Sequence, residues 1–199
     1  AEGGGVDLGD GVHEGAEALA FAALVREEEA LVLTAERGAE AVFEQVEGVL
    51  SVESGYSNGH TRNPSYQQVC GGDTGHNAVV RVEFDNQRIS SRAVLEISFA
   101  VHDPTTLNRQ GADVGTQYRS GIYLHDEAQR AVAREVLEEA NAAHGGRVVT
   151  ELRMLDNYSR AEDYHQRYFA KNPGQGYCAA VVGPKVEKFR KTFKARLKR

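Results

Sequence analysis

Short strand-like stretches recur along this chain, and helix-like stretches separate them. Apolar and polar residues alternate as in strands over residues 30–35, 49–57, 78–85, 121–125 and 147–155. Apolar residues recur at helical spacing over residues 16–30, 40–48, 90–102, 126–146 and 160–171. Ser90 or Ser91 and Asp126 supply N-caps, and Gly48 and Gly145 supply helix ends. Because the alternation lacks a regular βαβ period, it predicts an α+β fold, a two-layer α/β sandwich.

The chain divides into a short arm and one larger unit. Residues 1–15 are Gly-rich and acidic and have too little apolar surface to offset the entropy of ordering, so a flexible arm is expected. Residues 16–199 are long enough, and apolar enough, to form a single domain with one core. The helix expected over residues 16–30 ends in three glutamates, which is unfavourable for the helix dipole and points to a basic surface nearby.

Charge is distributed unevenly along the chain. The formal net charge of -6 argues against a general nucleic-acid binder. The last sixteen residues, in contrast, form a basic helix that begins at Pro184 and carries an apolar stripe. The basic 185–199 segment predicts peripheral contact with an anionic membrane surface or an acidic protein partner. The alternative is an ordinary packed helix with a solvated basic face.

Two cysteines, Cys70 and Cys178, lack the spacing of a zinc ribbon or a redox dithiol, although one bridge between them stays open. The seven histidines do not cluster with cysteines or carboxylates, so neither a metal site nor a cofactor is expected. The chain begins at Ala1 rather than Met, as a processed chain does, and import into a plastid or mitochondrion would account for this. The compartment stays open.

Four irregular stretches carry the most specific signal. In order, they are GYSNGHTRNPSYQQVCGGDTGH, HDPTTLNRQGADVGTQYRSGIY, AEDYHQRY and NPGQGYC. From about Ala30 to the C-terminus the chain resembles the A-type peptide methionine sulfoxide reductase (MsrA) family. The resemblance implies an MsrA-type, ferredoxin-like core with a mixed sheet, long loops and draped termini.

The same resemblance implies a thiol chemistry. In the family a cysteine of a GCFWG motif attacks the sulfoxide sulfur, and a second cysteine resolves the sulfenic acid that forms. The reaction needs a thiolate near a helix N-terminus, an acid for the departing oxygen and hydroxyl donors to hold that oxygen. The aromatic residues of the motif hold the substrate methyl group.

This sequence departs from the family pattern at four positions. Counted back from EAVF, Ala35 stands at the position of the attacking cysteine, and Glu36 and Arg37 replace the Phe and Trp. Ala78 stands at the position of the acid in TGHAE. The resemblance therefore implies a degenerate member without nucleophile, methyl pocket or acid. Glu36 and Arg37 are expected to pair with each other or to contact Asp113.

Other positions match the family pattern. Tyr66 and Tyr118 align with the hydroxyls that hold the sulfoxide oxygen, and Asp113 aligns with the carboxylate that steadies them. His76 lies in the TGH motif and completes the expected pocket remnant, while Cys178 aligns with the resolving cysteine. The alternatives are structural: the tyrosines and the carboxylate would satisfy each other, and a histidine would satisfy loop backbone groups. A free cysteine is more often an inert filler than a nucleophile.

Three functions follow as hypotheses. The first is a non-catalytic protein that acts as a structural or binding subunit of a larger protein assembly, such as an organellar membrane complex. The alternative is a thiol-dependent peptide-methionine (S)-S-oxide reductase, or an altered redox enzyme, that uses Cys178 or Cys70. A binder of methionine or its sulfoxide is the third, and Glu36 and Arg37 count against it because they make the methyl pocket charged.

Overall fold

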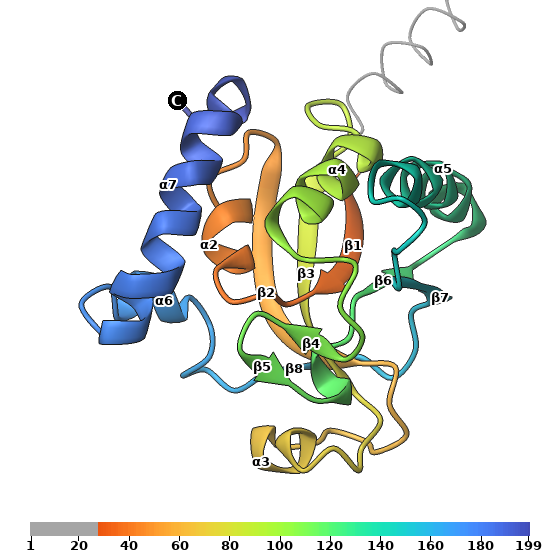
Figure 1. The fold of residues 1–199 in the computed structure, drawn as a ribbon, viewed down its shortest axis with the longest axis vertical. Helices are drawn as coiled ribbons and strands as arrows, with labels where there is room; N and C mark the ends of the chain where they lie inside the picture. Colours follow the sequence, from red (N-terminus) through yellow and green to blue (C-terminus); the bar gives the residue numbers. More distant parts are fainter. Residues whose placement is uncertain (1–27) are drawn as a thin grey trace, which may run out of the picture.

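The computed structural model describes residues 28–199 (Figure 1). The expected arm of residues 1–15 and most of the expected helix 16–30 lie outside the described residues. The strands are β1 (Glu28–Thr34), β2 (Val49–Ser57), β3 (Asn77–Asp85), β4 (Arg109–Gln110), β5 (Asp113–Val114), β6 (Gly121–Leu124), β7 (Glu151–Met154) and β8 (Ser159–Arg160). The α-helices are α2 (Ala39–Phe43), α3 (Tyr66–Cys70), α4 (Ser91–Val101), α5 (Glu127–Ala143), α6 (Tyr168–Lys171) and α7 (Gly183–Thr192).

Six of the strands form one mixed sheet in the order β7-β6-β1-β3-β2-β8. Strands β6 and β7 are parallel, and the other neighbours are antiparallel. The remaining two strands, β4 and β5, make a small hairpin within the long loop after α4. The mixed sheet with its helices confirms the predicted α+β fold.

The main core lies between the sheet and its helices. Leu31 and Leu33 of β1 point into it, together with buried residues of α2, α4, α5 and α7. Val32, between them, points to the opposite face and packs with Val79 and Tyr123. A strand directs successive side chains to opposite faces, so one face of the sheet packs against the helices. The sheet and these helices are the two layers in Figure 1.

Local capping explains why the two longest helices begin where the sequence predicts. The Ser90 side chain accepts a hydrogen bond from the Ala93 N–H at the start of α4. The Asp126 side chain accepts one from the Gln129 N–H at the start of α5. Each cap satisfies a backbone donor that the helix itself leaves free.

Several expected boundaries are wrong. Residues 28–30 belong to β1 rather than to the end of a helix, because they pair with residues 83–85 of β3. The expected helix 40–48 is helical only to Phe43, and residues 160–167 precede the short helix α6. The strand expected over 147–155 covers only Glu151–Met154. The segment between β2 and β3 contains α3, which begins with a capping box formed by Ser65 and Gln68.

The C-terminal basic segment packs on the domain. Val186 and Phe189 of α7 are buried, and Phe193 and Leu197 pack against the same core. Leu197 also forms a β-bridge with Val46. The apolar stripe is therefore accounted for by packing within the chain, and contact of this segment with a membrane or an acidic partner stays a prediction.

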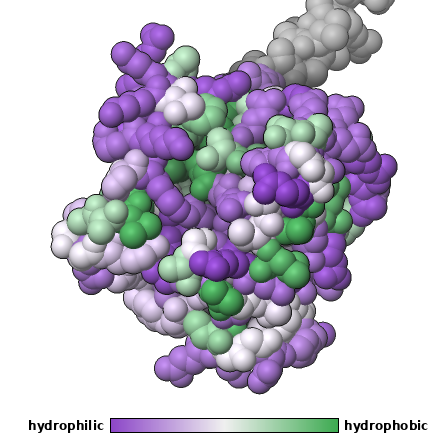
Figure 2. All heavy atoms as spheres, in the orientation of Figure 1, coloured by the Kyte–Doolittle hydropathy of each residue, from purple (hydrophilic) through white to green (hydrophobic). Residues whose placement is uncertain are grey.

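Among the described helices, none combines the length and the apolar character needed to cross a membrane. Hydrophilic side chains cover most of the face shown in Figure 2, and hydrophobic residues form separate small patches on it.

Candidate functional site

The chain turns sharply between β1 and α2, at residues 35–38. Gly38 makes the turn with a φ of 98°, in the left-handed region that favours glycine. A Cβ at this position would lie 2.9 Å from Cγ1 of Val182. The elbow is therefore packed directly against the C-terminal part of the chain.

A cavity of about 550 Å³ opens beside this elbow. Its walls come from the elbow, the first turn of α2, α3, α6, a 3₁₀ turn (Thr116–Tyr118) and a π-helical segment (Cys178–Val182). Seven residues singled out from the sequence line it: Ala35, Glu36, Arg37, Tyr66, Asp113, Tyr118 and Cys178. The fold thus gathers residues from the whole length of the described chain.

The charged residues of the elbow have separate partners. Glu36 is buried and forms an ion pair with Lys185 at the start of α7. Arg37 forms an ion pair with Asp113, as expected, and its guanidinium lies 4.2 Å from the centre of the Tyr177 ring. The expectation that Glu36 and Arg37 pair with each other is wrong. Burial lowers the pKa of Lys185 below its usual value.

Ala35 and Ala78 are neighbours across the sheet. The Ala35 N–H donates a hydrogen bond to the Ala78 carbonyl, with 3.0 Å between nitrogen and oxygen. Thr34 pairs with Val79 in the last registered step of β1 and β3, so residues 35 and 78 continue the same ladder. Ala35 lines the cavity, whereas Ala78 is not among the lining residues.

Two tyrosines of the cavity wall, Tyr66 and Tyr118, lie near Cys70. The hydrogen bond between the hydroxyl of Tyr66 and the thiol of Cys70, with burial, raises the pKa of Tyr66 to about 12. Burial, and then the nearby Cys70 and Asp113, raise the pKa of Tyr118. Both hydroxyls therefore stay protonated at neutral pH and are able to donate hydrogen bonds to a ligand.

Both cysteines are free thiols with different surroundings. Cys178 is buried and forms part of the cavity wall at the start of the π-helical segment. Single π-turns inside helices occur frequently at functional sites. Cys70 is exposed at the end of α3, next to Tyr66. Of the two, Cys178 is the thiol that a ligand in the cavity would meet.

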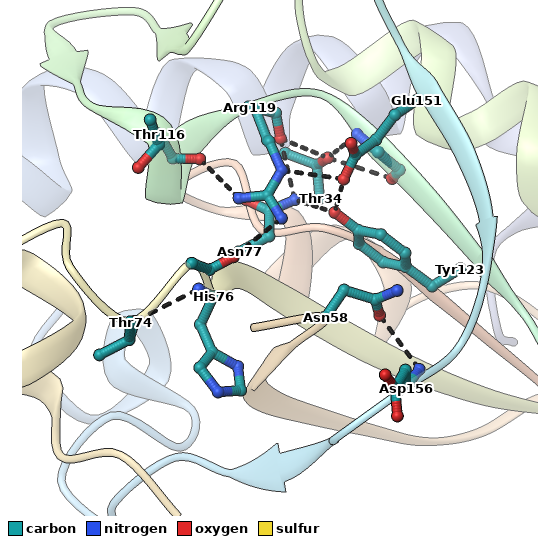
Figure 3. A network of polar contacts seen from close by, with 12 residues as sticks. Thr34, Asn58, Thr74, His76, Asn77, Thr116, Arg119, Tyr123, Glu151 and Asp156 are labelled. Atoms are coloured by element: carbon teal, nitrogen blue, oxygen red, sulfur yellow. Dashed lines mark hydrogen bonds and ion pairs between the residues drawn. The ribbon is translucent and has the colours of Figure 1, made fainter. Parts of the chain in front are cut away.

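His76 does not belong to the cavity, which corrects its place in the expected pocket remnant. Its ring is buried, and Nε2 lies 2.7 Å from the Thr61 carbonyl oxygen. Figure 3 shows it at the edge of a polar network that lies elsewhere in the fold. This agrees with the structural alternative, a histidine that satisfies loop backbone groups.

The network in Figure 3 lies on the side of β1 opposite the main core. The guanidinium of Arg119 donates to Glu151 (2.8 Å) and to the Gly75 carbonyl (3.1 Å), and the Tyr123 hydroxyl donates to the same Glu151 oxygen (2.5 Å). Asn77 donates to the Tyr123 hydroxyl and to the Arg119 carbonyl. These groups hold the loops that carry Tyr118.

Sequence reasoning missed several residues of the site. Glu162 accepts hydrogen bonds from the Tyr56 hydroxyl (2.8 Å) and the Tyr66 N–H (2.7 Å), which anchors α3 beside the cavity. Tyr164 and His165 line the cavity, and burial lowers the pKa of His165. All three residues lie in AEDYHQRY, so the family motif held the signal.

Within residues 28–199, no group of three or more histidines, cysteines or carboxylates has an arrangement that could hold a metal ion.

Comparisons with known proteins agree with the motifs. Residues 37–197 match the family described as peptide methionine sulfoxide reductase. A relative from Saccharolobus solfataricus, named peptide methionine sulfoxide reductase MsrA, is 51% identical over 159 residues, which cover 80% of this chain and 90% of the relative. A relative of the same name from Deinococcus radiodurans is 50% identical over 161 residues, covering 80% of this chain and 78% of the relative.

Solved structures give the same fold. The reduced form of Mxr1 from Saccharomyces cerevisiae superposes with a TM-score of 0.70 and 32% identity, covering 76% of this chain and 89% of that one. Methionine sulfoxide reductase A of Corynebacterium diphtheriae superposes with a TM-score of 0.68 and 34% identity, covering 78% and 81%. These neighbours confirm the MsrA-type core.

The relatives overturn the first functional hypothesis. Proteins about half identical to this chain, from many organisms, are named as reductases, which contradicts a non-catalytic structural or binding subunit. They favour the alternative, a peptide methionine sulfoxide reductase. The family match, the shared fold and the motif residues around one cavity agree with one another. The chain therefore belongs to the peptide methionine sulfoxide reductase family, which is a family of enzymes.

Proposed function

We propose that this protein is a thiol-dependent peptide-methionine (S)-sulfoxide reductase and that Cys178 supplies the reducing thiol. The observation that carries the proposal is the position of Cys178, a free thiol in the wall of the cavity that also holds Tyr66, Tyr118 and Asp113. The names of the relatives give the reaction class.

The choice of thiol follows from the elbow. The resemblance assigns the attacking position to Ala35, whose methyl group cannot act as a nucleophile. A family reaction on this chain therefore needs another thiol that reaches the same cavity. Cys178 lines that cavity, and its segment touches the elbow through Val182 and Gly38.

The proposed step needs no reactant besides the Cys178 thiol and the sulfoxide. The Cys178 sulfur attacks the sulfoxide sulfur, the sulfur–oxygen bond of the substrate breaks, and the oxygen becomes bonded to Cys178 as a sulfenic acid. The substrate is reduced to the thioether, the thiol is oxidised, and the thiol proton ends on the transferred oxygen. An external dithiol such as dithiothreitol then reduces the sulfenic acid to the thiol, with release of water and formation of the cyclic disulfide.

The tyrosines have a clear task in this step. As the sulfur–oxygen bond weakens, negative charge grows on the oxygen, and preorganised hydroxyl donors lower the free energy of that state. The raised pKa values of Tyr66 and Tyr118 keep both hydroxyls protonated. Asp113, which holds Arg37, fixes one side of the cavity.

Cys70 is the second candidate thiol, because the hydroxyl of Tyr66 is hydrogen-bonded to it at the edge of the same site. Its exposure makes it accessible to reductants, but it is not among the residues that line the cavity.

The test is reduction of methionine-S-sulfoxide with dithiothreitol as the reductant, with methionine quantified by chromatography. The full chain is compared with Cys178→Ser and Cys70→Ser. We expect turnover by the full chain and by Cys70→Ser, and a loss of at least about a hundredfold in Cys178→Ser. In the absence of reductant, dimedone should label Cys178 after one equivalent of sulfoxide. Turnover that persists in Cys178→Ser, or none in the full chain, would overturn the proposal.

A further inference from the structure

Exposed aromatic rings gather at the cavity. Tyr66, Tyr164, Tyr168 and Tyr177 are between 38% and 58% exposed, and all four line it. They are the only large aromatic residues exposed to this degree among residues 28–199. Exposed aromatic clusters are typical of recognition surfaces, because each ring offers a large apolar face at a low entropic cost.

The same cavity is rich in carboxylates. Glu36, Glu40 and Asp113 line it, and Arg37 is the only arginine or lysine among its described lining residues. Lys185, outside the lining, offsets Glu36. Asp113 is offset by Arg37, and among the described residues no ion pair involves Glu40. Glu40 therefore lies beside several aromatic rings without an ion pair; burial raises its pKa, and the backbone N–H groups and the charge of Arg167 oppose that rise.

Arg37 demonstrates the chemistry that this surface supports. Its guanidinium lies over the ring of Tyr177 at 4.2 Å from the ring centre and pairs at the same time with Asp113. A ring face and a carboxylate together attract a cation more strongly than either does alone. Tyr168 and Glu40 offer the same combination of a ring and a carboxylate in the same cavity.

We propose that this cavity selects methionine sulfoxide residues that are flanked by lysine or arginine, with Glu40 and Tyr168 receiving the flanking cation. The inference rests on the proposed function, because it assigns a substrate class to the same site. It adds a basis for choosing among oxidised peptides, which the reducing thiol does not provide.

Glu40 and Tyr168 lie close to one another in the fold. The Glu40 carboxylate accepts a hydrogen bond from the Arg167 N–H (2.7 Å), which directly precedes Tyr168. The Tyr168 hydroxyl donates to Gln175 (2.6 Å), which holds the ring in place at the rim. The Glu40 carboxylate and the Tyr168 ring are therefore positioned before a ligand arrives.

Binding is the primary readout, because it does not depend on turnover. The probes are three blocked pentapeptides, glycine at both ends and methionine sulfoxide in the centre, with flanking lysines, glutamines or glutamates. Titration calorimetry with the Cys178→Ser chain gives each dissociation constant at low and high salt. We expect the lysine peptide to bind about tenfold more tightly than the glutamate peptide at low salt, with the difference falling as salt rises.

Two pairs of variants locate the effect. Glu40→Gln keeps the acceptor for the Arg167 N–H but removes the charge, and should lower the lysine preference about threefold. Glu44→Gln is the matched control, because Glu44 pairs with Arg167 and does not line the cavity. Tyr168→Leu should weaken the lysine peptide, whereas Tyr168→Phe, which keeps the ring, should not.

The outcomes separate the two proposals. Equal affinities for the three peptides, or an unchanged preference in Glu40→Gln, would overturn the substrate preference and leave the reductase untouched. A lysine preference in a chain that does not reduce the sulfoxide would overturn the reductase and keep the recognition site.

Discussion

The two sides of the sheet near the end of β1 use polar groups in opposite ways. On one side, the network around Arg119, Glu151 and Tyr123 binds its members to one another. On the other, the cavity holds a free thiol, exposed rings and hydroxyls beside open space. Thr34, whose hydroxyl donates to the Arg119 and Gly121 carbonyls, and Ala35, which lines the cavity, are consecutive residues.

The difference separates the polar groups that stabilise the fold from those that are available to bind a ligand. Buried polar groups that satisfy one another hold a structure, and removal of one leaves its partners without compensation. Polar groups beside a cavity keep hydrogen-bonding capacity that a ligand can use. Substitutions in the network should therefore reduce stability, and substitutions in the cavity should reduce activity.

The largest effect is expected from Arg119→Met. Loss of the guanidinium leaves Glu151 without its cation and the Gly75 carbonyl without a donor, at a cost of about 3 kcal/mol in the free energy of unfolding. Urea denaturation measures it. The control is Arg109→Met, because Arg109 is exposed and bonds only within its own loop; its cost should stay under about 0.5 kcal/mol. Equal costs would contradict the distinction.

Tyr118→Phe should affect the opposite property. If the proposed reaction takes place, removal of this hydroxyl from the cavity should lower kcat/KM by about a hundredfold, while the urea midpoint stays unchanged. The counterpart is Tyr123→Phe, which removes a donor to Glu151 in the network and should lower stability by about 1 kcal/mol without changing turnover. If Tyr118→Phe unfolds the protein and Tyr123→Phe does not, the roles of the two sides are reversed.

A pH effect should arise from the buried histidine at the end of α4. His102 bonds to the Ser98 carbonyl (2.6 Å) and the Ser120 hydroxyl (2.8 Å), and its burial lowers its pKa below the usual 6.5. The unfolded chain then binds a proton that the folded chain does not, so stability is complete above pH 6.5 and falls as the pH drops below it. The slope from one such histidine approaches about 1.4 kcal/mol per pH unit.

His102→Gln should flatten the dependence of the unfolding free energy on pH between 6.5 and 5. His125 and His165, whose pKa values burial also lowers, will keep part of the slope. A slope that is the same in His102→Gln would remove His102 as its source.

The smallest effect is expected from Lys185→Met, which leaves the Glu36 carboxylate buried without its partner. Because Lys185 is partly exposed, the cost in unfolding free energy should be only about 1 kcal/mol. Lys188→Met, on the exposed side of the same helix, should change the unfolding free energy by less than about 0.3 kcal/mol. An equal cost for both would show that the pair contributes nothing.

Local features of the fold were predictable because short sequence segments determine them. The caps at Ser90 and Asp126 depend on residues three positions away, and the sequence indicates both. The beginning of β1 was not predictable in the same way, because residues 28–30 resemble the end of an acidic helix and become a strand only by pairing with β3. Pairing across more than fifty residues leaves no local pattern.

Part of the site was likewise predictable from the sequence, and part was not. Tyr66, Asp113 and Tyr118 were found because they lie in long irregular motifs, and the fold brings them to one cavity. The contact of Glu36 with Lys185 joins residues that are far apart in the sequence, and no spacing rule indicates it. His76 shows the limit of a motif, since it lies in a family signature and yet serves a loop.

The hydrogen bond between the backbones of Ala35 and Ala78 has a consequence for protein engineering. Residues opposite each other in an antiparallel ladder project their side chains from the same face of the sheet. Side chains introduced at positions 35 and 78, such as those of Ala35→Cys and Ala78→Glu, should therefore lie side by side. The register of β1 and β3 therefore makes positions 35 and 78 a natural site for introducing a cooperating pair of side chains.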